Sequence, residues 1–254
     1  MQREKYPFEI KLSKILPMHR TDHFNIYHYP GSYAEKDIEA IAKLREKAYG
    51  DICAFLDTHA EIKIDLYLFE DGDTKKMETN HQGAGWAFDT VMVEIYNETA
   101  KCHPYHELVH VFSDEIYGTT VSFLSEGLAV YASETCYDKD FGDNVNYNTD
   151  EEVIKHYRSN ELFPLKEMFT FEIGSGISKP DISYPQAASL VKYLYKTLGK
   201  TKFYGLYRTL EADYSDDGIK KNILEFEKCC GKSVDQINTE WLGVLDNIHG
   251  VQLP

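Results

Sequence analysis

The chain has 254 residues and a formal net charge of −15; 43% of its residues are hydrophobic and 27% are charged. This balance is typical of a folded globular protein that is long enough to bury a core, and it excludes a disordered chain. The negative charge would repel phosphate groups, and no basic stripe offsets it, so we expect no nucleic-acid partner. No apolar run approaches the length of about 18 residues that a membrane span needs.

The N-terminal segment and the cysteines indicate the cellular compartment. The start, MQREKYPFEIKLSK, is charged and lacks the apolar middle of a signal peptide. The cysteines are too sparse and too poorly spaced for a disulfide framework or a cysteine-zinc site. They are Cys53, Cys102, Cys136, Cys229 and Cys230. Both features favour a cytoplasmic location, and an exported one stays open if the start is trimmed. The oligomeric state is open.

The first part of the chain carries strand signals around one helix signal. The run His23–Tyr29 alternates apolar and polar residues as a strand does, and residues 34–59 have apolar side chains at helical spacing. Ile62–Asp71 predicts a second strand. Trp86–Tyr96 predicts a third, after the glycine-rich loop Asn80–Gly85. We expect a small sheet with a packed helix.

After the third strand the pattern becomes helical and stays so. Pro104 suits the first turn of a helix and Gly118 suits its end. Gly199 and Gly231 fall where the C-terminal caps of later helices would lie. Those further helices are predicted at residues 150–160, 185–198, 201–212, 216–229 and 233–248. A small sheet followed by helices predicts an α+β protein.

The clearest chemical signal is HPYHELVHVFSDEIYGTTVSFLSEGLAVYASE, residues 103–134. His106 and His110 stand four residues apart, so on a helix their imidazoles lie on one face, and neutral imidazole nitrogens bind zinc well. Glu107 lies about 100° around the helix from His106. It is therefore near such a metal without being directed at it, which suits a base that acts on water.

A catalytic zinc takes three protein ligands and keeps one position open. Glu126, in SEGLA, is the natural third ligand, because a tight turn between two antiparallel helices would bring it back beside His110. The other interpretation is two amphipathic helices whose histidines simply face water. The second motif at hairpin distance from the first favours the metal site.

HELVH followed by FLSEGLAVYAS resembles the gluzincin zinc peptidases, the group that contains thermolysin and the zinc aminopeptidases. The likeness is closest to the compact bacterial peptidase MA-like domains. Its specific part is residues 106–134, and at the level of pattern it extends from the His23 strand to the helix that contains Trp241. The metzincin pattern is excluded, because Ile116 stands where its third histidine would be.

The resemblance implies one Zn²⁺ per chain on the ligands His106, His110 and Glu126. It implies that Glu107 is the general base: it takes a proton as water attacks the scissile carbonyl and passes it to the leaving amine. It also implies a thermolysin-like architecture. Residues 1–137 would hold the sheet and the metal-binding helices, and residues 138–254 would form a helical subdomain that completes the cleft.

Two further roles follow from the resemblance alone. Related enzymes hold the oxyanion with a tyrosine or histidine from the helical half, and Tyr184, just before Pro185 at a predicted helix start, is the candidate here. The alternative for Tyr184 is ordinary packing. The strand Trp86–Tyr96 would be the edge strand that pairs with extended substrate. No GxMEN-like segment is present to fix a free substrate amine, so exopeptidase activity lacks support.

The expected function is therefore zinc-dependent hydrolysis of peptide bonds in a peptide or protein substrate. Two alternatives stay open. One is a catalytically silent or narrow-substrate domain of this fold that binds a protein or peptide. The other is a zinc hydrolase of a non-peptide amide, because the same water attacks any suitably placed carbonyl.

Overall fold

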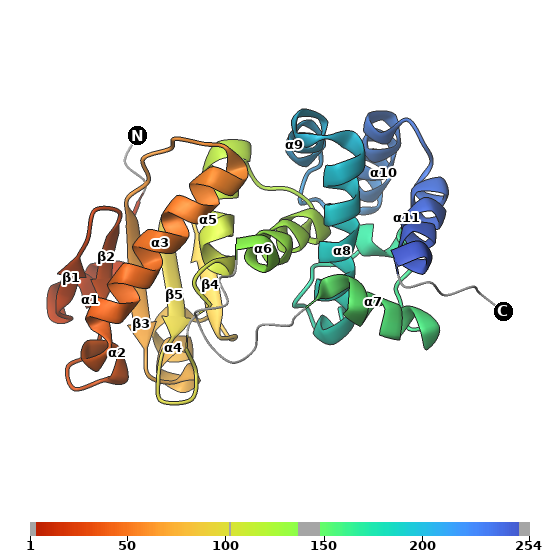
Figure 1. Cartoon of the computed structure of the whole chain (residues 1–254). Helices are drawn as coiled ribbons and strands as arrows, with labels where there is room; N and C mark the ends of the chain where they lie inside the picture. Colours follow the sequence, from red (N-terminus) through yellow and green to blue (C-terminus); the bar gives the residue numbers. More distant parts are fainter. Residues whose placement is uncertain (1–3, 102, 137–147, 249–254) are drawn as a thin grey trace. The chain divides into compact units, whose positions relative to one another are not determined.

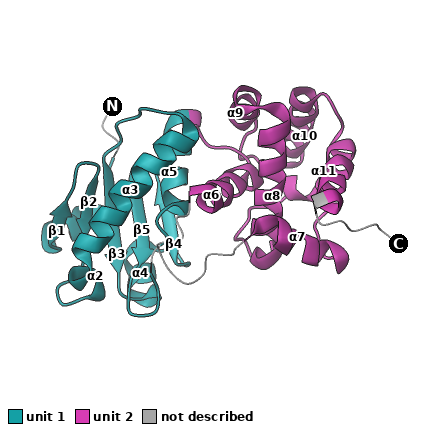
Figure 2. Ribbon diagram, viewed as in Figure 1, with its two compact units in different colours: residues 1–116 teal, residues 117–254 magenta. Residues whose placement is uncertain are grey.

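The computed structural model describes residues 4–101, 103–136 and 148–248 (Figure 1). The chain divides into two compact units, residues 1–116 and 117–254 (Figure 2). The first unit contains a mixed five-stranded sheet and the second contains helices, so the α+β class is confirmed. The predicted domain boundary after residue 137 lies outside the described residues and stays a prediction.

The elements of the first unit begin with α1 (Pro7–Ile15), β1 (Met18–Arg20), β2 (Phe24–Tyr27), α2 (Tyr33–Lys36) and α3 (Ile38–Leu56). They continue with β3 (Ile64–Phe69), α4 (Gly72–Thr79), β4 (Gly85–Phe88), β5 (Val91–Ile95) and α5 (His106–Tyr117), whose last residue belongs to the second unit. The second unit contains α6 (Ser122–Cys136), α7 (Thr149–Arg158), the short 3₁₀ helix η2 (Glu167–Phe169), α8 (Pro180–Leu198), α9 (Lys200–Thr209), α10 (Asp216–Cys230) and α11 (Val234–Ile248).

The sheet has the strand order β1-β2-β3-β5-β4. The three inner strands are parallel, and the outer strands β1 and β4 run antiparallel to their neighbours. Successive side chains of a strand point to opposite faces. On one face Phe8 and Leu12 of α1 pack with Tyr67 and Val93 in a buried apolar cluster. This packing explains why α1, which the sequence patterns missed, is stable on the sheet.

The opposite face of the sheet carries α3, which Figure 1 shows running along the strands. The ring of Tyr49 in α3 meets Phe24 of β2 edge-on at a centroid distance of 6.1 Å and Phe112 of α5 at 4.8 Å. Edge-to-face pairs of this kind stabilise a core beyond the area they bury. The aromatic contacts thus hold α3 and α5 on the same face of the sheet.

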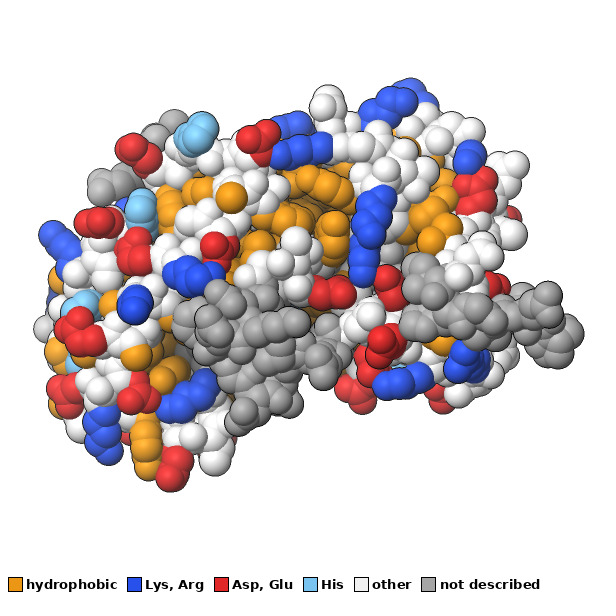
Figure 3. Space-filling view, in the orientation of Figure 1, with side chains coloured by type: hydrophobic (Ala, Val, Ile, Leu, Met, Phe, Trp, Pro, Cys, Tyr) orange, Lys and Arg blue, Asp and Glu red, His pale blue; other side chains and the backbone are white. Residues whose placement is uncertain are grey.

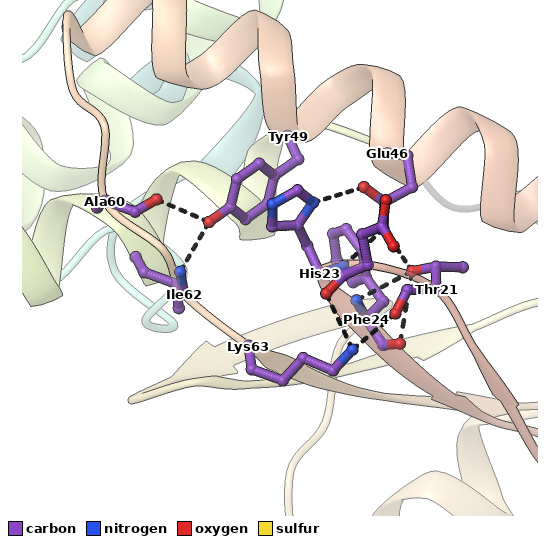
Figure 4. Close-up of polar contacts among 9 residues, drawn as sticks. Thr21, His23, Phe24, Glu46, Tyr49, Ala60, Ile62 and Lys63 are labelled. Atoms are coloured by element: carbon purple, nitrogen blue, oxygen red, sulfur yellow. Dashed lines mark hydrogen bonds and ion pairs between the residues drawn. The ribbon is translucent and has the colours of Figure 1, made fainter.

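Polar contacts from the middle of α3 hold the neighbouring loops (Figure 4). The Glu46 carboxylate accepts a hydrogen bond from the His23 backbone N–H at 2.8 Å, lies 2.6 Å from His23 Nδ1, and accepts another bond from the Thr21 hydroxyl. The Tyr49 hydroxyl donates to the Ala60 carbonyl at 2.8 Å and accepts from the Ile62 N–H at 2.7 Å. The side chains of Glu46 and Tyr49 thus form hydrogen bonds with backbone groups just before β2 and β3 begin.

The prediction of one strand over Trp86–Tyr96 is wrong. The segment forms a hairpin in which β4 pairs antiparallel with β5, with Phe88 opposite Val91. Asp89 in the two-residue turn has φ = 48°, a left-handed conformation that Asp tolerates better than most residues. Apolar residues on both sides of the turn mask it in the sequence pattern. Of this hairpin only β4 is an edge strand, and β5 lies inside the sheet.

The helices predicted for the second half of the chain are present, with one important difference. α8 begins at Pro180 rather than at residue 185, so the prediction that Pro185 starts a helix is wrong. Pro180 occupies the first turn, where a missing N–H costs nothing, and Pro185 lies inside the helix. The capping glycines are confirmed: Gly199 follows α8 with φ = 74°, and Gly231 follows α10 with φ = 68°. In this unit α8 packs against α6, α7 and α9.

No helix within the described residues combines the length and the apolar character that crossing a membrane would require. On the face shown in Figure 3, acidic and basic side chains are mixed with one another on both units.

Candidate metal centre

The two motif histidines face each other on α5. His106 Nε2 lies 3.3 Å from His110 Nε2, and the ring centroids are 5.0 Å apart with the ring planes at 77°. The four-residue spacing on a helix brings them together, as predicted. The helix begins at His106, two residues after Pro104, and Gly118 with φ = 81° follows its end. Two imidazole nitrogens that face each other suit one shared cation.

Glu126 on α6 completes the candidate ligand set. His106, His110 and Glu126 each offer one ligand atom, and these atoms all lie within 4.8 Å of one another. All three side chains are half-buried. Two imidazoles and one carboxylate form the ligand set of a catalytic zinc site with an open position. The residues present therefore fit this ion.

Glu107 lies against the edge strand of the sheet. A Cβ atom built on Gly85, the first residue of β4, would lie 2.9 Å from Glu107 Cδ and closer still to its Oε1. The carboxylate thus occupies the space that any side chain at position 85 would fill. In the sequence, Gly85 stands out only as the last residue of a glycine-rich loop. Hydrophobic periodicity could not predict that this glycine would contact Glu107.

A buried ion pair supports the segment that leads into α5. Arg45 of α3 and Glu94 of β5 have side chains 1% and 4% exposed, and the Arg45 guanidinium donates to the Glu94 carboxylate. Arg45 Nη1 also donates to the Pro104 carbonyl at 3.1 Å. The guanidinium therefore joins a helix, a strand and the chain just ahead of His106. The sequence patterns did not single out either member of the pair, since the two are 49 residues apart.

Tyr184 lies inside α8, in the second turn rather than at a helix start. Its hydroxyl oxygen lies 3.5 Å from the position of a Cβ atom built on Gly174, a loop residue with φ = 90°. The phenol is half-buried. The prediction that Tyr184 lies at a helix start is therefore wrong. Its role as an oxyanion donor stays a prediction.

Comparison with known proteins finds similarity to solved structures only. No protein-family model matches the chain, and no curated protein matches it by sequence. The M1 zinc metallopeptidase from Deinococcus radiodurans matches 89% of this chain with 13% identity and a TM-score of 0.46, over 49% of its own chain. A mutant of an M1 zinc metallopeptidase from that organism, bound to a Tyr-Ser-Ala substrate, matches 89% of this chain with 12% identity and a TM-score of 0.46, over 50% of its own chain. The chain spans about half the length of these structures.

Proposed function

We propose that the chain is a zinc-dependent peptidase of the gluzincin type, with a thermolysin-like arrangement of its motif helices, acting on peptide or protein substrates. The observation that carries the proposal is the convergence of ligand atoms from His106, His110 and Glu126 within 4.8 Å. The ordinary metal for this ligand set is zinc, one ion per chain. Glu107 follows the first ligand directly in the chain.

When bound, zinc acts as a Lewis acid that lowers the pKa of a water molecule and polarises a carbonyl group. Glu107 is the proton carrier of the proposed reaction: its carboxylate takes a proton from the attacking water and gives it to the leaving nitrogen. Gly85 supports this role, because its missing side chain leaves room for the carboxylate on the edge strand. Tyr184 is proposed to donate a hydrogen bond to the oxygen on which negative charge develops.

The test is cleavage of a diverse peptide library, followed by mass spectrometry, with the zinc content of each sample measured in parallel. We expect the zinc-loaded wild type to cut and the chelated sample to be inactive. Glu107→Gln should keep one zinc per chain and lose turnover. Glu115→Gln is the matched control, since Glu115 is an exposed residue of the same helix, and it should behave as wild type.

Equal turnover in wild type and Glu107→Gln would reject the proposed role of Glu107. A wild type that holds stoichiometric zinc but cuts no peptide would favour the two alternatives, a binding domain of this fold or a hydrolase of non-peptide amides. The cut positions of an active enzyme would show whether it trims chain ends or cuts internally. The variant Tyr184→Phe tests the oxyanion donor, with an expected loss of kcat on the order of 100-fold at unchanged zinc content.

A further inference from the structure

The side chain of Lys75 is fully buried, although its helix lies at the surface of the first unit. Its neighbours in α4, Lys76 and Met77, are exposed. Removing an ammonium group from water is costly unless the charge is compensated and the N–H groups are hydrogen-bonded. A buried ammonium at this position therefore depends on its hydrogen-bond partners.

The Lys75 ammonium holds the loop between α4 and β4. Nζ donates to the Gly83 carbonyl at 3.2 Å and lies 3.0 Å from His81 Nδ1. Burial and the nearby charge of Lys75 both lower the pKa of His81, so the imidazole is neutral at pH 7 and Nδ1 can accept the bond. The His81 ring in turn stacks on Trp86, with centroids 4.8 Å apart and planes at 10°.

The held loop leads directly to the carboxylate of Glu107. Gly85 comes two residues after Gly83, and its α-carbon lies against Glu107. Gly85 is paired with Glu94 across the β4–β5 ladder, and the Ala84 carbonyl accepts from the Ile95 N–H at 2.9 Å. A shift of the loop at Gly83 would therefore move the backbone on which the Glu107 side chain rests.

The charges around the ammonium fit the same arrangement. Burial lowers the pKa of Lys75, whereas the negative charges of Glu107 and Glu94 raise it, and burial is the larger effect. The Glu94 carboxylate is shared with Arg45, and its Oε1 has no hydrogen-bond partner among the described residues. One cation thus lies within electrostatic reach of both the proposed general base and a buried structural carboxylate.

We propose that Lys75 is a positioning residue for Glu107: it clamps the Asn80–Gly85 loop, through Gly83 and His81, so that the edge strand holds the Glu107 carboxylate in place. The loop clamp is independent of any activity. Its catalytic consequence rests on the proposed peptidase function. Lys75 acts through its contacts with Gly83 and His81 rather than on substrate or metal.

The experiment compares Lys75→Met with Lys76→Met in the full zinc-loaded chain. Both changes replace lysine by methionine in α4, but only the first removes a buried ammonium. Hydrogen exchange at the backbone amides of residues 83–86 is the first readout, and we expect Lys75→Met to speed it on the order of tenfold. The second readout is peptide cleavage. We expect kcat to fall by about 10- to 100-fold, with KM and zinc content unchanged. Lys76→Met should match wild type in both.

His81→Phe covers the case in which Lys75→Met does not fold. Phenylalanine keeps a ring that can stack on Trp86 but removes the acceptor for the ammonium, so loop exchange should speed up and kcat should fall. Unchanged exchange at residues 83–86 in a folded Lys75→Met or His81→Phe protein overturns the clamp. Faster exchange with unchanged kcat overturns the positioning role. A zinc-loaded wild type that cuts no peptide, with faster exchange in the variant, overturns the peptidase proposal and supports the clamp.

Discussion

Gly127 in α6 lies with its α-carbon against the carbonyl group of Ala187 in α8. A Cβ atom built on Gly127 would lie 2.5 Å from the Ala187 oxygen and 2.6 Å from Val191 Cγ2. No side chain fits between these two helices at this point, since the obstacle is backbone that cannot rotate away. Gly127 directly follows Glu126, so this close helix contact also fixes the turn of α6 that carries the proposed metal ligand.

Gly127→Ala should therefore destabilise the protein by about 1–3 kcal/mol, the usual cost of overpacking a core. Gly205→Ala is the control, because Gly205 lies in α9 with no other heavy atom within 4 Å of an added Cβ. Alanine there should be neutral or stabilise by up to about 1 kcal/mol. Urea unfolding of both variants measures the difference. Equal unfolding midpoints would show that α6 and α8 can move apart freely.

Gly85→Ala should displace the Glu107 carboxylate, because the added Cβ would overlap it. The Glu107 side chain can turn aside at little cost, so we expect folding and zinc content to be kept. Turnover should fall by about 100-fold, since an error of 1 Å in placement costs that much. Gly50→Ala, at an open position of α3, should leave turnover unchanged. Full activity in Gly85→Ala would place the reacting carboxylate elsewhere.

Replacing one member of the Arg45–Glu94 pair should destabilise the protein far more than replacing both. Arg45→Met removes the ion-pair partner of the buried Glu94 carboxylate, at an expected cost of about 3–5 kcal/mol. The double variant Arg45→Met/Glu94→Leu removes both charges and should recover much of that loss, because an apolar pair needs no compensation. Chemical denaturation of the two single variants and the double variant gives the coupling. Additive losses would contradict a direct interaction.

Stability should depend on acid pH through Glu46. Burial raises the pKa of this carboxyl, but the bonds from His23 and Thr21 outweigh burial and hold the pKa below its ordinary value. A lowered pKa in the folded state adds stability above the ordinary glutamate pKa of about 4.3, and that stability is lost as the pH falls through the folded-state value. Glu46→Gln should therefore cost more at pH 6 than at pH 3.

The matched control for the pH experiment is Glu39→Gln, since Glu39 lies on the same helix with its side chain 86% exposed. Urea unfolding midpoints measured from pH 3 to pH 6 should show no pH-dependent penalty for this variant. A penalty for Glu46→Gln that stays constant over the whole range would mean that the His23 and Thr21 bonds do not favour the ionised form.

Removal of metal should lower the thermal unfolding midpoint of the wild type, because an ion that binds only the folded chain stabilises it by mass action. The stabilisation is about 2.7 kcal/mol when free zinc is at 100 times its Kd. Glu107→Gln should show the same shift with chelator, whereas Glu126→Gln should show a smaller one. Identical shifts in wild type and Glu126→Gln would remove Glu126 from the ligand set.

Local patterns predicted much of the fold in advance. Apolar spacing located the inner strands β2 and β3 and most of the helices, and the caps at Gly199 and Gly231 marked two helix ends. These signals are local because each depends on residues within about one or two turns of the backbone. The prediction failed where such a signal was weak or ambiguous. The turn at Asp89 lies between two apolar runs, so the segment resembled a single strand. Two prolines could each begin a helix, and α8 begins at Pro180 rather than at Pro185.

The sequence by itself predicted the candidate ligands His106, His110 and Glu126. The spacing of His106 and His110 brings their nitrogens together on any α-helix, and SEGLA supplied Glu126. Only the tertiary structure decided what surrounds that centre. The contacts of Glu107 with Gly85, of Arg45 with Glu94 and of Lys75 with the loop at Gly83 join residues on different elements. No periodicity encodes such pairs, because strand register and helix packing set them, and these arise only when the whole unit folds.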